Sequence, residues 1–433
     1  MITNIKKRRS FFKHPDGQRN MQKILREVIA KLEPDARAIQ QEAKGTLQRL
    51  NAELKKRRLS ATAIVGGSVA KGTFLSHDHD VDIFVQFPLT EQRPLTELLT
   101  PVVKTVFPKA QRLHGSRDYF RAEGKLNYEI VPVLKITKAA QAKNITDCSP
   151  LHVLWVRKFP KLRQQIMLTK AFCKASGVYG AESYIGGFSG HVVDILTIWT
   201  GGFIPLLRKS LKWKDREVID YYRVHKGKAL FRLNKSKLQS PIIVIDPTQP
   251  ERNAAAALTE ERLRKFQHAA AAFLKKPSAA AFERRAIDVA MLRKRYKGKK
   301  MLLLRMQPFP GKHDVIGAKM RKALEHISLQ LQENDFKILE QDWHWQQTHD
   351  AVAWWVLPTK PLERQQQWIG PPVDKPEHVM AFRKRYPKAK RIGKKWVAIV
   401  PRAHVVPETL VRQMLKEPYI IERVQDTTLE VFE

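Results

Sequence analysis

The chain has 433 residues, with 79 lysines and arginines against 42 aspartates and glutamates, which gives a formal net charge of +37. A charge this large is self-repulsive unless a polyanion offsets it, so we expect nucleic acid as a partner before an anionic membrane. No apolar run approaches the ~20 residues that span a bilayer, and Cys148 and Cys173 are too few for a disulfide framework or a cysteine metal cluster. The composition excludes a membrane-spanning protein, a disulfide-rich protein and a cysteine metal cluster. It predicts a cytoplasmic protein of several domains, with no membrane attachment.

The N-terminal segment divides into an arm and two helices. Residues 1–20 are basic and rich in turn-forming residues, and we expect a mobile arm. A helical period begins near Met21, and Pro34 and Asp35 separate a first helix from a second one. Apolar residues at spacings of three and four line the second helix: Ile39, Ala43, Leu47, Leu50 and Leu54. We expect both helices to brace the back of the sheet that follows.

The next stretch alternates between strand and turn signals. Residues 61–65 form a short apolar run, which ends in Gly66-Gly67-Ser68, and residues 81–87 alternate with the period of a strand. Glycine has no Cβ, so such a turn brings backbone N–H groups close to a phosphate, and the Ser68 hydroxyl adds a donor. The pattern predicts a strand, a phosphate-binding turn, a short helical segment and a second strand.

Asp80 and Asp82 belong to this second strand. Residues two apart on a strand project from the same face, so the two carboxylates stand side by side. Their repulsion is relieved when Mg²⁺ bridges them to the phosphates of a substrate. The alternative is a strand with two solvated aspartates. We expect His77, Asp78 and His79 to lie on the surface of the preceding loop.

A third carboxylate follows after a helix and a hairpin. Residues 94–107 have the pattern of an amphipathic helix, and residues 119–123 and 128–136 read as strands joined at Gly124-Lys125. Glu129 lies among apolar strand residues, where an isolated acid is costly. If its strand lies beside that of Asp82, Glu129 completes a metal site; otherwise it is an edge residue that faces water.

These motifs resemble the DNA polymerase β nucleotidyltransferase superfamily, in which Gly-Ser is followed about a dozen residues later by Asp-x-Asp. The resemblance implies a mixed sheet whose three carboxylates, here Asp80, Asp82 and Glu129, bind two Mg²⁺ ions. It also implies transfer of a nucleotidyl group from a nucleoside triphosphate, with Gly67 and Ser68 against the leaving phosphates.

The following motifs narrow the resemblance to the archaeal, class I CCA-adding enzymes. They are Ser149-Pro150-Leu151-His152 before a helix expected over residues 153–176, Lys170-Ala171-Phe172, Gly177-Val178-Tyr179-Gly180-Ala181-Glu182 and Gly187-Phe188-Ser189-Gly190. The resemblance implies that Lys71, His152, Lys170 and Tyr179 contact the triphosphate. On the residues alone, Lys170 would be a solvated lysine, Tyr179 a packing residue and His152 a satisfied histidine.

The resemblance continues through Asp246-Pro247 and Glu251-Arg252-Asn253-Ala254. It implies that Arg252 faces the incoming base and that Asn253 also binds the nucleotide. The planar guanidinium suits both bases because it can donate to acceptors on cytosine and on adenine. The alternative for Arg252 is an ion pair with Glu251 or Asp246. An alanine-rich helix is expected over residues 258–275.

The last 150 residues carry a looser version of the resemblance. Strands are expected over residues 301–306 and 336–339, with a helix over residues 317–334 between them. Tryptophans interleaved with lysine and arginine suit stacking on bases, although core packing explains most of them better. The basic stripes predict an RNA surface because phosphate contacts need only charge.

The predicted architecture is a mixed α+β, multidomain protein. Its predicted parts are an arm (residues 1–20), a polymerase β-like nucleotidyltransferase head with a mixed sheet (21–150), a helical neck and nucleotide-binding region (151–283), and an α/β body and tail that bind RNA (284–433).

The predicted function is addition and repair of the 3′-terminal CCA of tRNA from CTP and ATP with two Mg²⁺ ions; the chain acts alone or as a homodimer. Glu129, where the family commonly has Asp, and Lys71, where relatives often have Arg, depart from the pattern without removing a charge. The alternatives are a poly(A)-adding enzyme of the same superfamily and an inactive, basic RNA-binding protein.

Overall fold

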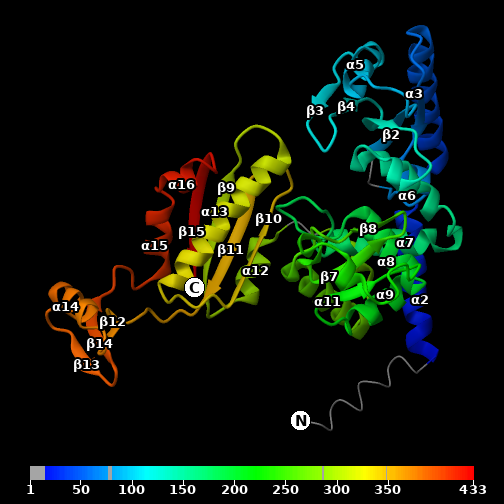
Figure 1. Cartoon of the computed structure of the whole chain (residues 1–433). Coiled ribbons are helices and arrows are strands. Elements are labelled where there is room, and N and C mark those ends of the chain that lie inside the picture. The colour runs from blue at the N-terminus through cyan, green and yellow to red at the C-terminus, as the bar shows by residue number, and fades with distance from the viewer. Residues whose placement is uncertain (1–14, 77–79, 285–286, 348) are drawn as a thin grey trace. The chain divides into compact units, whose positions relative to one another are not determined.

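The chain forms two compact units in a computed structural model, residues 1–284 and 285–433 (Figure 1). The structure describes residues 15–76, 80–284, 287–347 and 349–433. Most of the predicted arm (residues 1–14) and the loop residues His77, Asp78 and His79 therefore lie outside the described residues. Helix α2 (Pro15–Leu32) begins within the segment expected as an arm, before the predicted start near Met21.

The first unit begins with a five-stranded sheet in the order β1-β2-β5-β4-β3. Strands β2 and β5 are parallel, and the other neighbours are antiparallel, so the sheet is mixed as predicted. The hairpin of β4 and β5 turns through Gly124, and this confirms its prediction. The bounds are β1 (Thr62–Val65), α4 (Gly67–Lys71), β2 (Asp80–Phe87), α5 (Leu95–Val106), β3 (Gln111–Leu113), β4 (Tyr119–Glu123) and β5 (Asn127–Leu134).

Helices α3 (Ala36–Lys56) and α5 cover this sheet and share its core. The Asp35 carboxylate caps α3 by accepting hydrogen bonds from the backbone N–H groups of Arg37 and Ala38. The apolar stripe of α3 is buried, as predicted, through Leu50 and Leu54. The prediction was wrong for α2, which packs against α7 in a second core instead of bracing the sheet.

This second core lies among the helices that follow the sheet. They are α6 (Ser149–Val156), α7 (Arg163–Ala175), α8 (Gly190–Thr200), α9 (Phe203–Ser210), α10 (Ala229–Arg232) and α11 (Glu260–Lys275), with the strands β6 (Glu217–Ile219), β7 (Ile242–Asp246) and β8 (Gln249–Asn253). The prediction of one continuous helix over residues 153–176 was wrong, because the structure has two helices there. The chain leaves the helical conformation between α6 and α7, because Phe159, which precedes Pro160, has φ −119° and ψ 56°.

The second unit contains two sheets. An antiparallel sheet in the order β10-β11-β9-β15 packs against α13, α15 and α16, and a smaller sheet, β12-β14-β13, contacts α14. The bounds are α12 (Val289–Arg295), β9 (Lys300–Gln307), α13 (His313–Glu333), β10 (Glu340–His344), β11 (Ala351–Leu357), β12 (Gln365–Pro372), α14 (Pro376–Arg385), β13 (Lys390–Ile392), β14 (Lys395–Pro401), α15 (Pro407–Met414), α16 (Pro418–Ile421) and β15 (Asp426–Phe432).

The prediction of a strand over residues 336–339 was wrong, because these residues connect α13 to β10. The Leu339 N–H donates to the Val356 carbonyl oxygen, but β10 itself begins at Glu340. Trp355 is buried in this core, as expected for most tryptophans, whereas Trp368 on the smaller sheet is half exposed. Among the described residues, no single helix is long and apolar enough to cross a bilayer; α8 and α9 meet that length and composition only as a pair bent by 93°.

Candidate active site

Two of the three predicted carboxylates face each other across neighbouring strands. Strands β2 and β5 are parallel, and Asp82 is in register with Glu129. Asp80 begins β2, two residues before Asp82, and is exposed to solvent. This arrangement confirms the prediction that the strand of Glu129 lies beside that of Asp82, and it brings three acids to one end of the strand pair.

Burial and a neighbouring acid disfavour the charged form of Asp82. Burial and the nearby Glu129 raise the pKa of Asp82 to about 6, although Lys71 and Lys170 act in the opposite direction. A cation bound here would relieve this repulsion, and carboxylate oxygens are the donors that Mg²⁺ prefers. The residues therefore fit a magnesium site.

A glycine turn holds the Asp82 carboxylate in place. The Gly66 N–H donates to the carbonyl oxygen of Asp82 over 2.7 Å, and α4 begins at the next residue. Gly67 has φ +51°, and a Cβ at this position would lie only 1.5 Å from Asp82 Oδ2. Only glycine satisfies both the backbone conformation and this approach. Ser68 follows in the first turn of α4.

Lys71, at the end of α4, is fixed by an ion pair. Its Nζ lies 2.7 Å from Asp194 Oδ2 on α8, and both side chains are largely buried. Burial would raise the pKa of Asp194, but Lys71 and His191 lower it, so the acid stays ionised. The sequence did not single out Asp194, which lies in α8 after the predicted Gly187–Gly190 motif.

Lys170 and Tyr179 lie close together, as the resemblance implied. Lys170 is buried on α7, and its Nζ lies 5.9 Å from the centre of the Tyr179 ring. Lys174 Nζ lies 5.1 Å from the same ring centre. Since Lys170 and Lys71 both lower the pKa of Asp82, the two lysines bring positive charge to the carboxylates.

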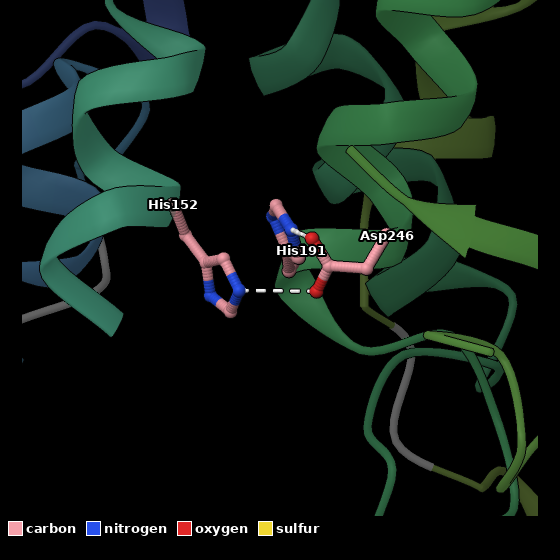
Figure 2. Close-up of side chains that lie close together, drawn as sticks. All are labelled: His152, His191 and Asp246. Atoms are coloured by element: carbon pink, nitrogen blue, oxygen red, sulfur yellow. Dashed lines mark hydrogen bonds and ion pairs between the residues drawn. The ribbon is translucent and has the colours of Figure 1, made fainter. Parts of the chain in front are cut away.

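A second acid, Asp246, gathers side chains from distant parts of the chain (Figure 2). Asp246 ends β7, and its Oδ2 accepts from His152 Nε2 at 3.1 Å and from Arg252 Nη1 at 3.0 Å. Its Oδ1 accepts from the backbone and hydroxyl of Thr248 and lies 3.4 Å from His191 Nε2. The rings of His152 and His191 are stacked, with centres 3.8 Å apart. We call His152, His191, Asp246 and Arg252 the Asp246 cluster.

The Asp246 cluster has electrostatics opposite to those of the sheet carboxylates. Burial alone would raise the pKa of Asp246, but hydrogen bonds from His152 and His191 hold it well below its usual range. Burial and the neighbouring His191 lower the pKa of His152 to about 4, so this ring is neutral at pH 7. The neutral ring brings no positive charge, and its one N–H is the Nε2–H that Asp246 accepts, so His152 can donate to a phosphate only when it releases Asp246.

Two predicted residues have partners that bear on their roles. Arg252 makes the ion pair with Asp246 that the sequence left open, and a third of its side chain remains exposed. Asn253 is buried; its Oδ1 accepts from the N–H groups of Val244 and Ala255, and its Nδ2 donates to Lys237 and Ser240. Asn253 thus shapes the turn and has no polar atom left for a nucleotide, in contrast to the prediction.

Sequence reasoning missed one further contact at the sheet. Arg121 on β4 is paired in register with Glu129, and its Nη2 lies 3.2 Å from Glu129 Oε1. The Gly124-Lys125 turn carried the signal, because it fixes which residues oppose each other in the hairpin. Arg121 therefore holds one of the two oxygens of Glu129.

Comparisons with known proteins agree with this geometry. Family models match residues 47–152 (nucleotidyltransferase domain), 164–283 (second domain of tRNA nucleotidyltransferase) and 297–421 (C-terminal domain of CCA-adding enzyme). A CCA-adding enzyme of Methanococcus maripaludis (strain C7) is 30% identical over 377 residues, which cover 83% of each chain. The chain belongs to the CCA-adding enzyme family. It is a tRNA nucleotidyltransferase.

Other similar proteins match different shares of this chain. A CCA-adding enzyme of Methanothermobacter thermautotrophicus is 27% identical over 90% of this chain and 88% of its own. That of Nanoarchaeum equitans is 43% identical, but the matched segment spans 45% of this chain and half of the relative. A solved cytoplasmic RNA terminal U-transferase shares the fold, at 13% identity and a TM-score of 0.50, over 62% of this chain and 99% of its own.

Proposed function

We propose that this member of the CCA-adding enzyme family transfers CMP and AMP from CTP and ATP to the 3′ hydroxyl of a tRNA that lacks its CCA end. The observation that carries the proposal is the register of Asp82 with Glu129 beside the Gly67 turn. Acids that repel each other next to a phosphate-binding turn suit a reaction of metal-bound triphosphates.

Asp80, Asp82 and Glu129 would hold two Mg²⁺ ions. When bound, such ions polarise the attacking hydroxyl and neutralise charge on the phosphates. The oxygen of Glu129 that Arg121 does not hold remains available as a ligand. The 3′ oxygen of the tRNA forms a bond to the α-phosphorus, and the bond from that phosphorus to the pyrophosphate breaks.

The leaving phosphates would be held by Gly67 and Ser68, and by Lys71, Lys170, His152 and Tyr179. The ion pair with Asp194 supports this role for Lys71, because a fixed ammonium group needs no reorganisation when the phosphate arrives. Lysine offers a point charge rather than the bidentate fork of arginine, so orientation must come from the glycine turn.

Arg252 would face the base. Asp246 holds one end of its guanidinium and leaves part of the side chain exposed. The exposed N–H groups can meet acceptors on cytosine or adenine, which supports recognition of both bases by one residue. The formal net charge of +37 supports tRNA as the polyanionic partner.

The test is product length on a sequencing gel. The purified protein and Mg²⁺ are incubated with a tRNA transcript that lacks CCA, together with CTP, ATP or both. We expect two additions with CTP alone and a third only when ATP is also present. A long A-tail would instead identify a poly(A)-adding enzyme, and tight tRNA binding without incorporation would identify an inactive RNA-binding protein.

A further inference from the structure

The Asp246 cluster contains three side chains that could serve together as metal ligands. His152 on α6, His191 on α8 and Asp246 at the end of β7 each offer one ligand atom, and these atoms all lie within 4.8 Å of one another. Both imidazole rings present Nε2 to the carboxylate (Figure 2). The three ligands come from separate helices and a strand, so the fold and not a local turn brings them together.

The distances within the cluster suit a small transition-metal ion. Asp246 Oδ2 lies 3.1 Å from His152 Nε2, and Asp246 Oδ1 lies 3.4 Å from His191 Nε2. Two ligands at about 2.0–2.1 Å from one tetrahedral ion stand roughly 3.3 Å apart. The carboxylate and imidazole atoms therefore need little translation, but the stacked rings must turn apart so that both nitrogens point at one ion.

Groups around the three ligands support the same interpretation. Metal binding at Nε2 leaves the ring proton on Nδ1, and Asp194 Oδ2 lies 3.9 Å from His191 Nδ1, close to where an acceptor is needed. Arg252 and Thr248 hydrogen-bond to Asp246 and can continue to orient it once it binds an ion. Carboxylates that orient ligand histidines are a regular feature of zinc sites.

We propose that His152, His191 and Asp246 form a binding site for a transition-metal ion of the zinc class, separate from the carboxylates of the sheet. Imidazole nitrogen favours zinc or cobalt, whereas a site of carboxylates alone favours magnesium. Occupation of the site inhibits nucleotide transfer, because the His152 ring turns to bind the ion and is then held away from the triphosphate. This second step rests on the proposed function, whereas the metal site itself does not.

The first experiment titrates the full-length, metal-free protein with Co²⁺ in the absence of nucleotide. A tetrahedral site with nitrogen ligands gives strong visible absorption, whereas a six-coordinate oxygen site gives weak absorption. We expect one strong band that Zn²⁺ displaces. His191→Phe keeps an aromatic ring beside His152 but removes the ligand, and it should weaken Co²⁺ binding by ~100-fold or more.

Three variants make this result decisive. Asp82→Asn removes a carboxylate of the sheet and should leave the band unchanged. His114→Phe removes an exposed histidine that pairs with the Asp118 carboxylate, and it should also leave the band unchanged. His191→Gln can still donate a hydrogen bond to Asp246, so it shows whether the loss of the band in His191→Phe is only a folding defect. Zn²⁺ should raise the Tm of the wild type but not the Tm of either His191 variant. An unchanged band in the His191 variants, or its loss in Asp82→Asn, would overturn the site.

The second experiment measures CTP incorporation in excess Mg²⁺ with increasing Zn²⁺. Each protein is compared with its own rate without zinc. We expect inhibition of the wild type at the zinc concentration that displaces the cobalt band, and much weaker inhibition of His191→Phe. Equal inhibition of both would overturn the regulatory step. A wild type that is inactive in Mg²⁺ alone would instead refute the proposed function, and the cobalt band would still decide the site.

Discussion

Asp82 and Asp246 are both carboxylates held inside the first unit, yet their surroundings have opposite effects. Asp82 faces Glu129 in register, and burial together with this neighbour raises its pKa to about 6. Asp246 is also buried, but it accepts hydrogen bonds from two histidines, which hold its pKa well below the usual range, and a further one from Arg252. The protein therefore disfavours the charged form of Asp82, whereas it stabilises the charged form of Asp246.

We expect the two acids to have different tasks. A carboxylate with unmet charge binds an external cation readily, because the ion removes an unfavourable interaction that the fold maintains. A satisfied carboxylate fixes the side chains around it, here His152 and Arg252. We therefore expect Asp82 to act in chemistry and Asp246 to position groups that bind the nucleotide, and the same substitution at each residue should give different results.

The largest effect is expected from Asp82→Asn. The amide is a poor ligand for Mg²⁺, and a loss of ~4 kcal/mol of transition-state stabilisation lowers the rate by about 10³-fold. In metal-free protein the same change removes a repulsive charge, so the Tm should rise. Single-turnover incorporation and differential scanning calorimetry measure the two effects. Substantial activity, or a lower Tm, would contradict the account of unmet charge.

Gly67→Ala tests how closely the turn holds the Asp82 carboxylate. The new Cβ would overlap Asp82 Oδ2, and misplacement of a reacting group by about 1 Å can lower a rate by ~10²-fold. Gly201→Ala is the matched control, because Gly201 also has a positive φ but no atom lies within 4 Å of the added Cβ. Both variants should lose ~1–2 kcal/mol of stability from backbone strain, and only Gly67→Ala should lose activity. Equal activities would show that the close approach is unimportant.

The sequence predicted the arrangement of the strands that carry Asp82 and Glu129 because its signals are local. Asp80 and Asp82 are two residues apart on one strand, and the glycine turn precedes them directly. The position of Glu129 followed from a hairpin whose turn could be recognised. Periodicity and turn chemistry, which act over a few residues, were sufficient here.

The Asp246 cluster could not be predicted in the same way. His152, His191 and Asp246 are separated by tens of residues and meet only after α6, α8 and β7 have packed. The resemblance included Asp246 in its Asp-Pro motif and gave roles to His152 and Arg252, but it did not indicate that Asp246 joins these two residues. Asn253 shows the reverse failure, since a polar residue inside a binding motif is used for a buried turn.

Asp246→Asn should have a smaller effect on activity than either change at the sheet. Removal of the charge weakens the bonds from His152 and Arg252, and hydrogen bonds to charged groups contribute about 1.5–3 kcal/mol each. Unfolding in urea should therefore show lower stability, opposite in sign to metal-free Asp82→Asn. The KM for CTP and ATP should rise about tenfold, which corresponds to ~1.4 kcal/mol of binding. The measurement uses protein treated with a chelator and supplied only with Mg²⁺, so that no other metal contributes. A lower kcat with an unchanged KM would contradict a positioning role for Asp246.

The smallest effect on nucleotide addition is expected from Asn253→Ala. The change leaves the buried N–H groups of Val244 and Ala255 without their acceptor, and each such group costs about 1–3 kcal/mol of stability. The KM for CTP and ATP, measured well below the melting temperature, should not change, because the side chain already uses its polar atoms inside the turn. Arg252→Ala provides the contrast, since it should raise both KM values with little loss of stability from a partly exposed side chain. A raised KM in Asn253→Ala at full folding would restore Asn253 to the nucleotide site and would mean that its turn opens when nucleotide binds.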